Sequence, residues 1–241
     1  MDGGIIMRST VYQASSVQSM QKTVYLFHAK DPGSALTHFI GFVMALFATF
    51  PLLIQASAAC VGTVGMVSLS IFMLSMMMLY AASTVYHSFN LPGNGNMVLK
   101  KIDHMMIFVL IAGTYTPVCV LKLHNKTGLI MLTAVWAVAA AGMILKACWV
   151  TCPKWFSSIL YIAMGWICIL ALPQIIAALS AQQFLWLLTG GIMYTVGGII
   201  YAMKLSVFNE IHPNFGSHEI FHLFVMAGSF CHYICVYLFL V

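Results

Sequence analysis

Two histidines stand four residues apart near the start of the last apolar stretch of the sequence. The segment SHEIFHLF places His218 and His222 on one face of a helix, where both side chains can bind one metal ion. Glu219 completes the pattern H-E-x-x-H, the signature of zinc proteases, in which the glutamate acts as general base. The pattern leaves three alternatives open: a metalloprotease, another metal enzyme, or a membrane helix that carries the letters by chance.

Two other short segments carry polar groups suited to the same chemistry. ASTVYHSF contains Ser83 and His87 four residues apart, and KIDHMMIF contains Asp103. Together with the two later histidines, His87 would complete the three protein ligands of a catalytic zinc, leaving a fourth position for water. Asp103 could accept a hydrogen bond from that water, and Ser83 could act as an outer donor or contact the substrate.

The elements that position these residues follow from composition. Of 241 residues, 62% are hydrophobic and 6% are charged, and the mean hydropathy is +0.98. Soluble domains carry about 25% charged residues, so the chain belongs in a bilayer. Continuously apolar runs predict an all-α seven-transmembrane-helix bundle rather than a barrel. The expected spans are 35–55, 63–86, 103–122, 127–149, 155–178, 182–203 and 218–241. The seven spans form one transmembrane domain over residues 35–241, and an N-terminal cytoplasmic tail over residues 1–34 precedes it.

Lysine and arginine predict the orientation of the bundle. One side, with the tail and the connections after the second, fourth and sixth spans, carries eight of these residues, and the other side carries two. The eight are Arg8, Lys22, Lys30, Lys100, Lys101, Lys146, Lys154 and Lys204, and the two are Lys122 and Lys126. We therefore expect the N-terminus in the cytoplasm and the C-terminus outside. The net charge of +5 then reflects topology and anionic lipid, and we expect no nucleic-acid partner.

This topology brings the polar groups to one depth. The second span ends in the cytoplasm and the third and seventh begin there, so all three groups lie at the cytoplasmic end of the bundle. Ionisable groups inside a membrane are costly and therefore indicate function. Each also has a simpler interpretation: a histidine at a span end can meet headgroups, a carboxylate is favourable at a helix N-terminus, and a serine can bond to its own backbone.

The other histidines are expected to lie outside this site. His28, His124 and His212 fall outside the spans, and His38, near the cytoplasmic start of the first span, is a much weaker candidate for the site. His232 lies ten residues beyond His222, about 15 Å along a helix, and is too far to share the metal shell.

The three segments STVYHSF, IDHMMIFVLIAGTYTPV and SHEIFHLFVMAGSF resemble the motifs of the hemolysin III proteins, within the wider progestin and adipoQ receptor family. The resemblance implies a seven-helix membrane protein with its N-terminus inside. It also implies zinc held by His87, His218 and His222, with Asp103 and Ser83 as the accompanying functional residues. The family motif is H-x-x-x-H, so Glu219 is expected to be incidental, and an intramembrane metalloprotease is the lesser alternative.

Three functions remain as hypotheses. The family is grouped with membrane hydrolases that cleave lipid amides, so the resemblance implies a zinc-dependent hydrolase of the cell membrane with a membrane lipid as substrate or ligand. Its bacterial branch is named for a haemolytic activity, which makes a pore-forming cytolysin the second hypothesis. A receptor or sensor with a structural zinc is the third.

Overall fold

The computed structural model describes residues 29–123, 125–203 and 216–240. All regular elements in these ranges are helices, and they form seven stretches long and apolar enough to cross a bilayer. These are α2 (Pro32–Ala58), α3 (Gly62–Ser88), α4 (Gly95–Pro117) continued by the π-helix η1 (Val118–Lys122), α5 (Lys126–Cys148), α6 (Lys154–Gly165) continued by the 3-10 helix η2 (Ile167–Ala171) and α7 (Leu172–Ala178), α8 (Ala181–Met203) and α10 (Ser217–Tyr237).

Large apolar side chains cover the outside of the bundle. Leu170 is 85% exposed, and Phe47 and Leu129 are each 67% exposed. A soluble monomer rarely presents contiguous apolar surface of this kind, whereas lipid tails solvate it without cost. Helices satisfy their own backbone hydrogen bonds, which is why this sequence forms helices in a bilayer. The chain is therefore a multi-pass membrane protein.

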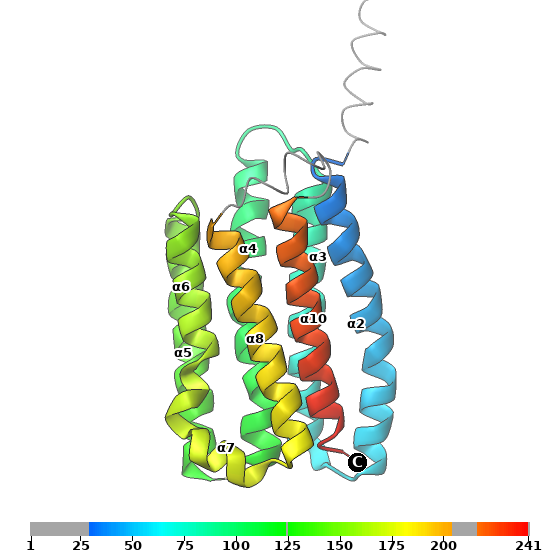
Figure 1. The fold of residues 1–241 in the computed structure, drawn as a ribbon. Coiled ribbons are helices and arrows are strands. Elements are labelled where there is room, and N and C mark those ends of the chain that lie inside the picture. The colour runs from blue at the N-terminus through cyan, green and yellow to red at the C-terminus, as the bar shows by residue number, and fades with distance from the viewer. Residues whose placement is uncertain (1–28, 124, 204–215, 241) are drawn as a thin grey trace, which may run out of the picture.

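The helices are arranged so that the first and last spans are neighbours. In Figure 1, α2 packs on α3, α3 on α4 and α4 on α5, while α10 lies against both α8 and α2. Small residues allow close approach: a Cβ added at Gly113 of α4 would lie 2.1 Å from the Ser75 Oγ of α3. Because successive spans run in opposite directions, the end of α3 and the starts of α2, α4 and α10 all lie at one end of the bundle, and the C-terminus lies at the other.

The fifth span is interrupted halfway. α6 ends at Gly165, and Trp166 separates it from the tighter helix η2. The Tyr115 hydroxyl of α4 donates to the Gly165 carbonyl at 2.6 Å and accepts from the Cys168 N–H at 2.9 Å. These bonds satisfy backbone groups that lipid could not, and irregular backbone is tolerated at membrane depth only where protein or a cavity surrounds it.

Seven spans are confirmed, and their ends agree with the expected ones within three residues at all but two places. The third span begins at Gly95 rather than at 103, and the seventh helix ends at Tyr237. α2 begins at Pro32, inside the expected tail, whose residues 1–28 lie outside the described ranges. The early start of α4 places Asp103 two turns inside the helix instead of at its opening.

Candidate metal centre

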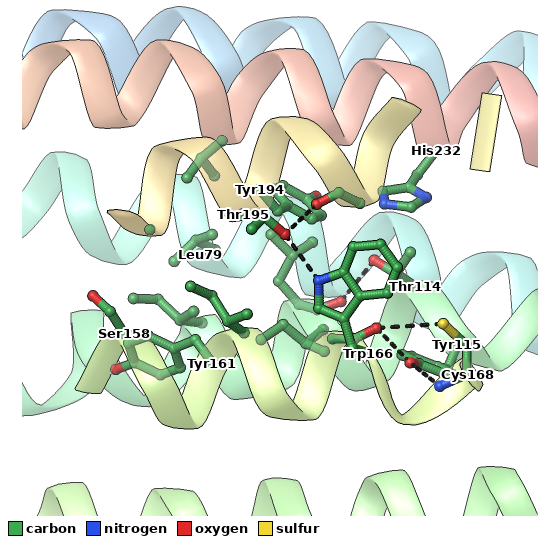
Figure 2. Close-up of a pocket in the computed structure, with 18 of the residues that line it drawn as sticks. Leu79, Thr114, Tyr115, Ser158, Tyr161, Trp166, Cys168, Tyr194, Thr195 and His232 are labelled. Carbon is green, nitrogen blue, oxygen red and sulfur yellow. Dashed lines mark hydrogen bonds between the residues drawn. The ribbon is translucent and has the colours of Figure 1, made fainter. Parts of the chain in front are cut away.

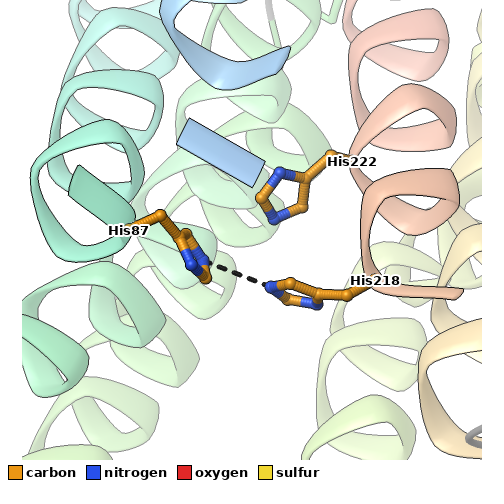
Figure 3. A group of neighbouring side chains, drawn as sticks. All are labelled: His87, His218 and His222. Carbon is orange, nitrogen blue, oxygen red and sulfur yellow. Dashed lines mark hydrogen bonds between the residues drawn. The ribbon is translucent and has the colours of Figure 1, made fainter. Parts of the chain in front are cut away.

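Three histidines from two helices meet at the end of the bundle where α2 begins. His87 lies in the last turn of α3, and His218 and His222 occupy the first two turns of α10. One ligand atom from each lies within 4.8 Å of the others, and Figure 3 shows the three rings facing a common point. His87 and His222 are buried, and His218 is partly buried.

Hydrogen bonds fix which ring nitrogens face one another. The Nδ1 of His87 lies 2.9 Å from the Asp31 Oδ2, and the Nδ1 of His222 lies 3.1 Å from the Thr37 hydroxyl oxygen. The Thr37 hydroxyl donates to the carbonyls of the preceding turn, so its lone pairs accept from His222. Both rings are thereby assigned Nδ1–H and leave Nε2 as a lone pair.

These assignments fit a metal ion. The Nε2 atoms of His87 and His218 lie 3.2 Å apart, so the Nε2–H of His218 can donate to the Nε2 lone pair of His87. Two zinc–nitrogen bonds of about 2.0–2.1 Å in a tetrahedral shell hold their nitrogens roughly this far apart, and three imidazoles are a common ligand set of catalytic zinc. An outer carboxylate on Nδ1 is also the usual partner of a ligating histidine. The donor set therefore suits Zn²⁺.

Asp103 and Ser83 lie beside this centre. Both are buried, at 7% and 1% exposure, and both line the cavity that His218 and His222 also line. Ser83 Oγ has no hydrogen-bonding partner in the part of the chain that the structure describes, unlike Thr84, which bonds to the Tyr80 carbonyl. The simpler interpretation of Ser83 as a backbone-bonded serine therefore does not apply.

The surroundings of Asp103 test the simpler interpretation that it is a carboxylate stabilised at a helix N-terminus. The dipole effect of a helix falls off within the first turn, whereas Asp103 lies eight residues after Gly95. Its Oδ2 lies 3.1 Å from the Nδ1 of His104, although the alignment is too poor for a hydrogen bond. The Nε2 of His104 lies 3.5 Å from the Tyr201 hydroxyl of α8. Asp103 is thus held inside the bundle and is not a solvated helix-end charge.

Both carboxylate oxygens of Glu219 are engaged by groups other than the three histidines. Its Oε2 accepts the Gly216 N–H at 2.8 Å, and its Oε1 accepts the Ser34 hydroxyl of α2. The first bond satisfies a free donor at the start of α10, and the second ties α10 to α2. The glutamate of H-E-x-x-H therefore has a structural task, in keeping with its expected irrelevance to the chemistry.

Three residues of α2 and its approach were missed from the sequence. Asp31 and Thr37 hold two of the histidines, as described above. His38, expected to be only a weak candidate, is stacked on His222 with ring centroids 3.6 Å apart and planes 5° from parallel. All three lie at the start of the first span, at the same end of the bundle as the histidines, so the same depth argument could have found them. His28, His124 and His212 lie outside the described residues.

A cavity of about 370 Å³ extends from this centre into the bundle. His38, Ser83, Asp103, His218 and His222 line one end. Its middle is lined mostly by apolar side chains, among them Leu79, Ile107, Leu110, Ile162, Leu188 and Val225. Its far end lies at the interruption of the fifth span, beside Trp166 and Cys168 (Figure 2). The arrangement is a polar, metal-suited end on an apolar chamber.

Comparison with known proteins gives a consistent result. A family model described as "Haemolysin-III related" matches residues 27–233. The chain is 37% identical over 208 residues to a protein of Bacillus subtilis (strain 168) named "Hemolysin-3 homolog", covering 86% of this chain and 92% of that protein. It is 35% identical over 211 residues to "Hemolysin-3" of Bacillus cereus, covering 87% of this chain and 91% of that protein.

Proposed function

Because the chain belongs to the hemolysin III family of multi-pass cell-membrane proteins, we propose that it is a zinc-dependent hydrolase that cleaves a membrane lipid amide. One observation carries the proposal: His87 converges with His218 and His222, and these last two line the polar end of an apolar cavity together with Asp103 and Ser83. The proposal also includes the orientation, with this end of the bundle in the cytoplasm.

The three histidines would hold the metal through the Nε2 atoms of His87 and His222 and one nitrogen of His218. When bound, zinc lowers the pKa of a coordinated water and polarises a carbonyl oxygen. Asp31 and Thr37 keep the Nδ1 atoms of His87 and His222 occupied, so that neither ring has to rotate on binding.

Asp103 is the group suited to move the proton. It lines the cavity beside the histidines, and an amide hydrolysis needs a base that takes a proton from the attacking water and returns it to the leaving amine. The Ser83 hydroxyl, buried and without a partner in the described ranges, can donate a hydrogen bond to the substrate carbonyl or to the water.

The chamber beyond the histidines supports a lipid as the substrate. Its volume of about 370 Å³ lies within the range of small-molecule sites, roughly 300–1,000 Å³. An acyl chain would fill the apolar part and leave its amide at the polar end. Exclusion of bulk water by that chain would strengthen the electrostatic interactions of Asp103.

The test combines metal analysis with hydrolysis of a fluorescent N-acyl lipid amide in detergent micelles. Wild-type protein is expected to bind zinc and cleave the amide. His87→Ala should lose the metal and the activity together. Asp103→Asn keeps the shape of the side chain but cannot take a proton, so it should retain zinc and lose roughly 10²–10⁴-fold in turnover. Full activity of a zinc-loaded Asp103→Asn protein would instead favour a structural zinc and a receptor or sensor.

A further inference from the structure

His232 lies on the same helix as the metal centre but deeper in the bundle. It follows His222 by ten residues, which is about 15 Å along α10. The side chain is 6% exposed and lines the far part of the cavity, where Figure 2 shows it beside Tyr194. Its Nδ1 has no hydrogen-bonding partner among the residues that the structure describes.

The polar groups around His232 are otherwise paired. The hydroxyls of Tyr80 and Tyr194 meet the Ser229 hydroxyl at 2.7 and 2.8 Å. The Trp166 indole N–H donates to the Thr195 hydroxyl at 2.9 Å, and the Thr114 hydroxyl donates to the Leu110 carbonyl at 2.8 Å. Proteins leave few buried polar atoms unpaired, so the exception at this depth calls for a partner that comes from outside the chain.

The His232 ring is also held in place. A Cβ added at Gly190 of α8 would lie 2.7 Å from the His232 Nε2, so the absence of a side chain there makes room for the ring. The Tyr194 ring packs 5.2 Å away on the same side. The space left by Gly190 and the contact with Tyr194 therefore hold an imidazole at the wall of an otherwise apolar chamber.

We infer that the far end of the cavity is a second recognition site, in which His232 binds a hydroxyl carried within the apolar chain of the ligand, about 15 Å from the metal centre. A hydroxyl both donates and accepts, so it can pair with a nitrogen of the cavity-lining ring in either tautomer. The inference rests on the proposed function, because it takes the cavity to hold a lipid chain. It narrows the substrate class to lipids whose chain bears an oxygen at that distance from the amide.

The experiment measures binding to the zinc-loaded protein in detergent by displacement of a fluorescent fatty acid. The probes are stearate and three hydroxystearates, with the hydroxyl near the carboxylate, in the middle of the chain, or at the terminal methyl. Wild type should prefer the mid-chain hydroxyl over stearate by about fivefold, the value of one hydrogen bond of about 1 kcal/mol. His232→Leu should bind stearate as wild type does and lose the positional preference.

Two further variants make the test specific. Cys235→Ala alters the same helix three residues on, at a buried position outside the cavity lining, and should keep the preference. His232→Gln, which can still hydrogen-bond, should keep part of it and serves if the leucine variant does not fold. Equal binding of all four probes to wild type, or an unchanged preference in His232→Leu, would overturn the inference while leaving the proposed function intact. Failure of every probe to bind would contradict both.

Discussion

Replacement of Asp31 tests whether the approach to the first span is part of the metal centre. The Asp31 Oδ2 accepts the Nδ1–H of His87 at 2.9 Å, and the Asp31 N–H donates to the His87 carbonyl at 2.9 Å. Only the first contact depends on the side chain. Asp31→Ala therefore removes the orienting carboxylate and leaves the backbone bond in place, so the expected loss falls on zinc affinity and not on the fold.

The size of the expected loss in zinc affinity depends on the solvent exposure of the Asp31 side chain. Removing the outer partner of a ligating histidine typically costs 10–100-fold in metal affinity. The Asp31 side chain is 42% exposed, so water screens the interaction and the lower end applies. We expect about tenfold weaker zinc binding for Asp31→Ala, equivalent to about 1.4 kcal/mol. Asp31→Asn keeps an acceptor but loses the charge, and since charged hydrogen bonds are about twice as strong as neutral ones, its loss should be about threefold.

Zinc titration against a competing chelator, with the protein in detergent, measures these differences. The control is Lys30→Met, because the Lys30 ammonium lies 3.7 Å from the Asp31 Oδ2 and the variant changes charge at the same place. Its zinc affinity should stay within about twofold of wild type, since exposed ion pairs contribute little. Unchanged zinc binding in Asp31→Ala, or equal losses in all three variants, would refute the orienting role of the carboxylate.

Three other predictions follow from the described geometry. Reporter tags at the two ends should lie on opposite sides of the membrane with the N-terminal tag cytoplasmic, and a cytoplasmic C-terminal tag would contradict the predicted orientation. Glu219→Gln should keep zinc and most activity, because glutamine can still accept the Gly216 N–H; a loss of roughly 10²-fold in turnover with zinc bound would identify a general base instead. Burial alone raises the pKa of Cys152, but contacts with Ser157 at 3.3 Å and the Lys146 ammonium at 3.0 Å hold that pKa below its usual value. Alkylation of Cys152, followed by peptide mass spectrometry, should therefore reach half its maximal rate at a lower pH than a free thiol assayed beside it, and Lys146→Met should raise that midpoint.

Hydropathy was sufficient for the spans because each apolar run has to cross the whole bilayer. It failed where a helix continues beyond the apolar span. The first two turns of α4 have the sequence GNMVLKK, which is too polar to be counted in the third span but is helical and precedes it. It also could not reveal the interruption after Gly165, because the residues on both sides are apolar and the cause is a tyrosine hydroxyl on another helix.

The candidate site, too, could be predicted from the sequence only in part. Depth in the bilayer brought His87, His218 and His222 together without any knowledge of packing, because the two helix ends that carry them had to share one membrane face. Their role as ligands stays a prediction. His38 was placed at the right depth, but its stacking on His222 depends on the contact between the first and last spans, which no local pattern encodes. The apolar chamber was equally hidden, since its lining residues look like ordinary core in the sequence.

The neighbourhood of α2, α3 and α10 has a consequence for biogenesis. His87 and His218 are 131 residues apart in the sequence, an interval that a ribosome adding about 5–20 residues per second makes in roughly 7–26 s. During that time α2, α3 and α4 can already pack, with His87 held by Asp31, but two of the three histidines have not yet been synthesised. The final helix must then find its place between α8 and α2. For the zinc site proposed above, metal uptake would be the last event in the maturation of the protein, and a chain that loses its final helix would keep only one of the three proposed ligands.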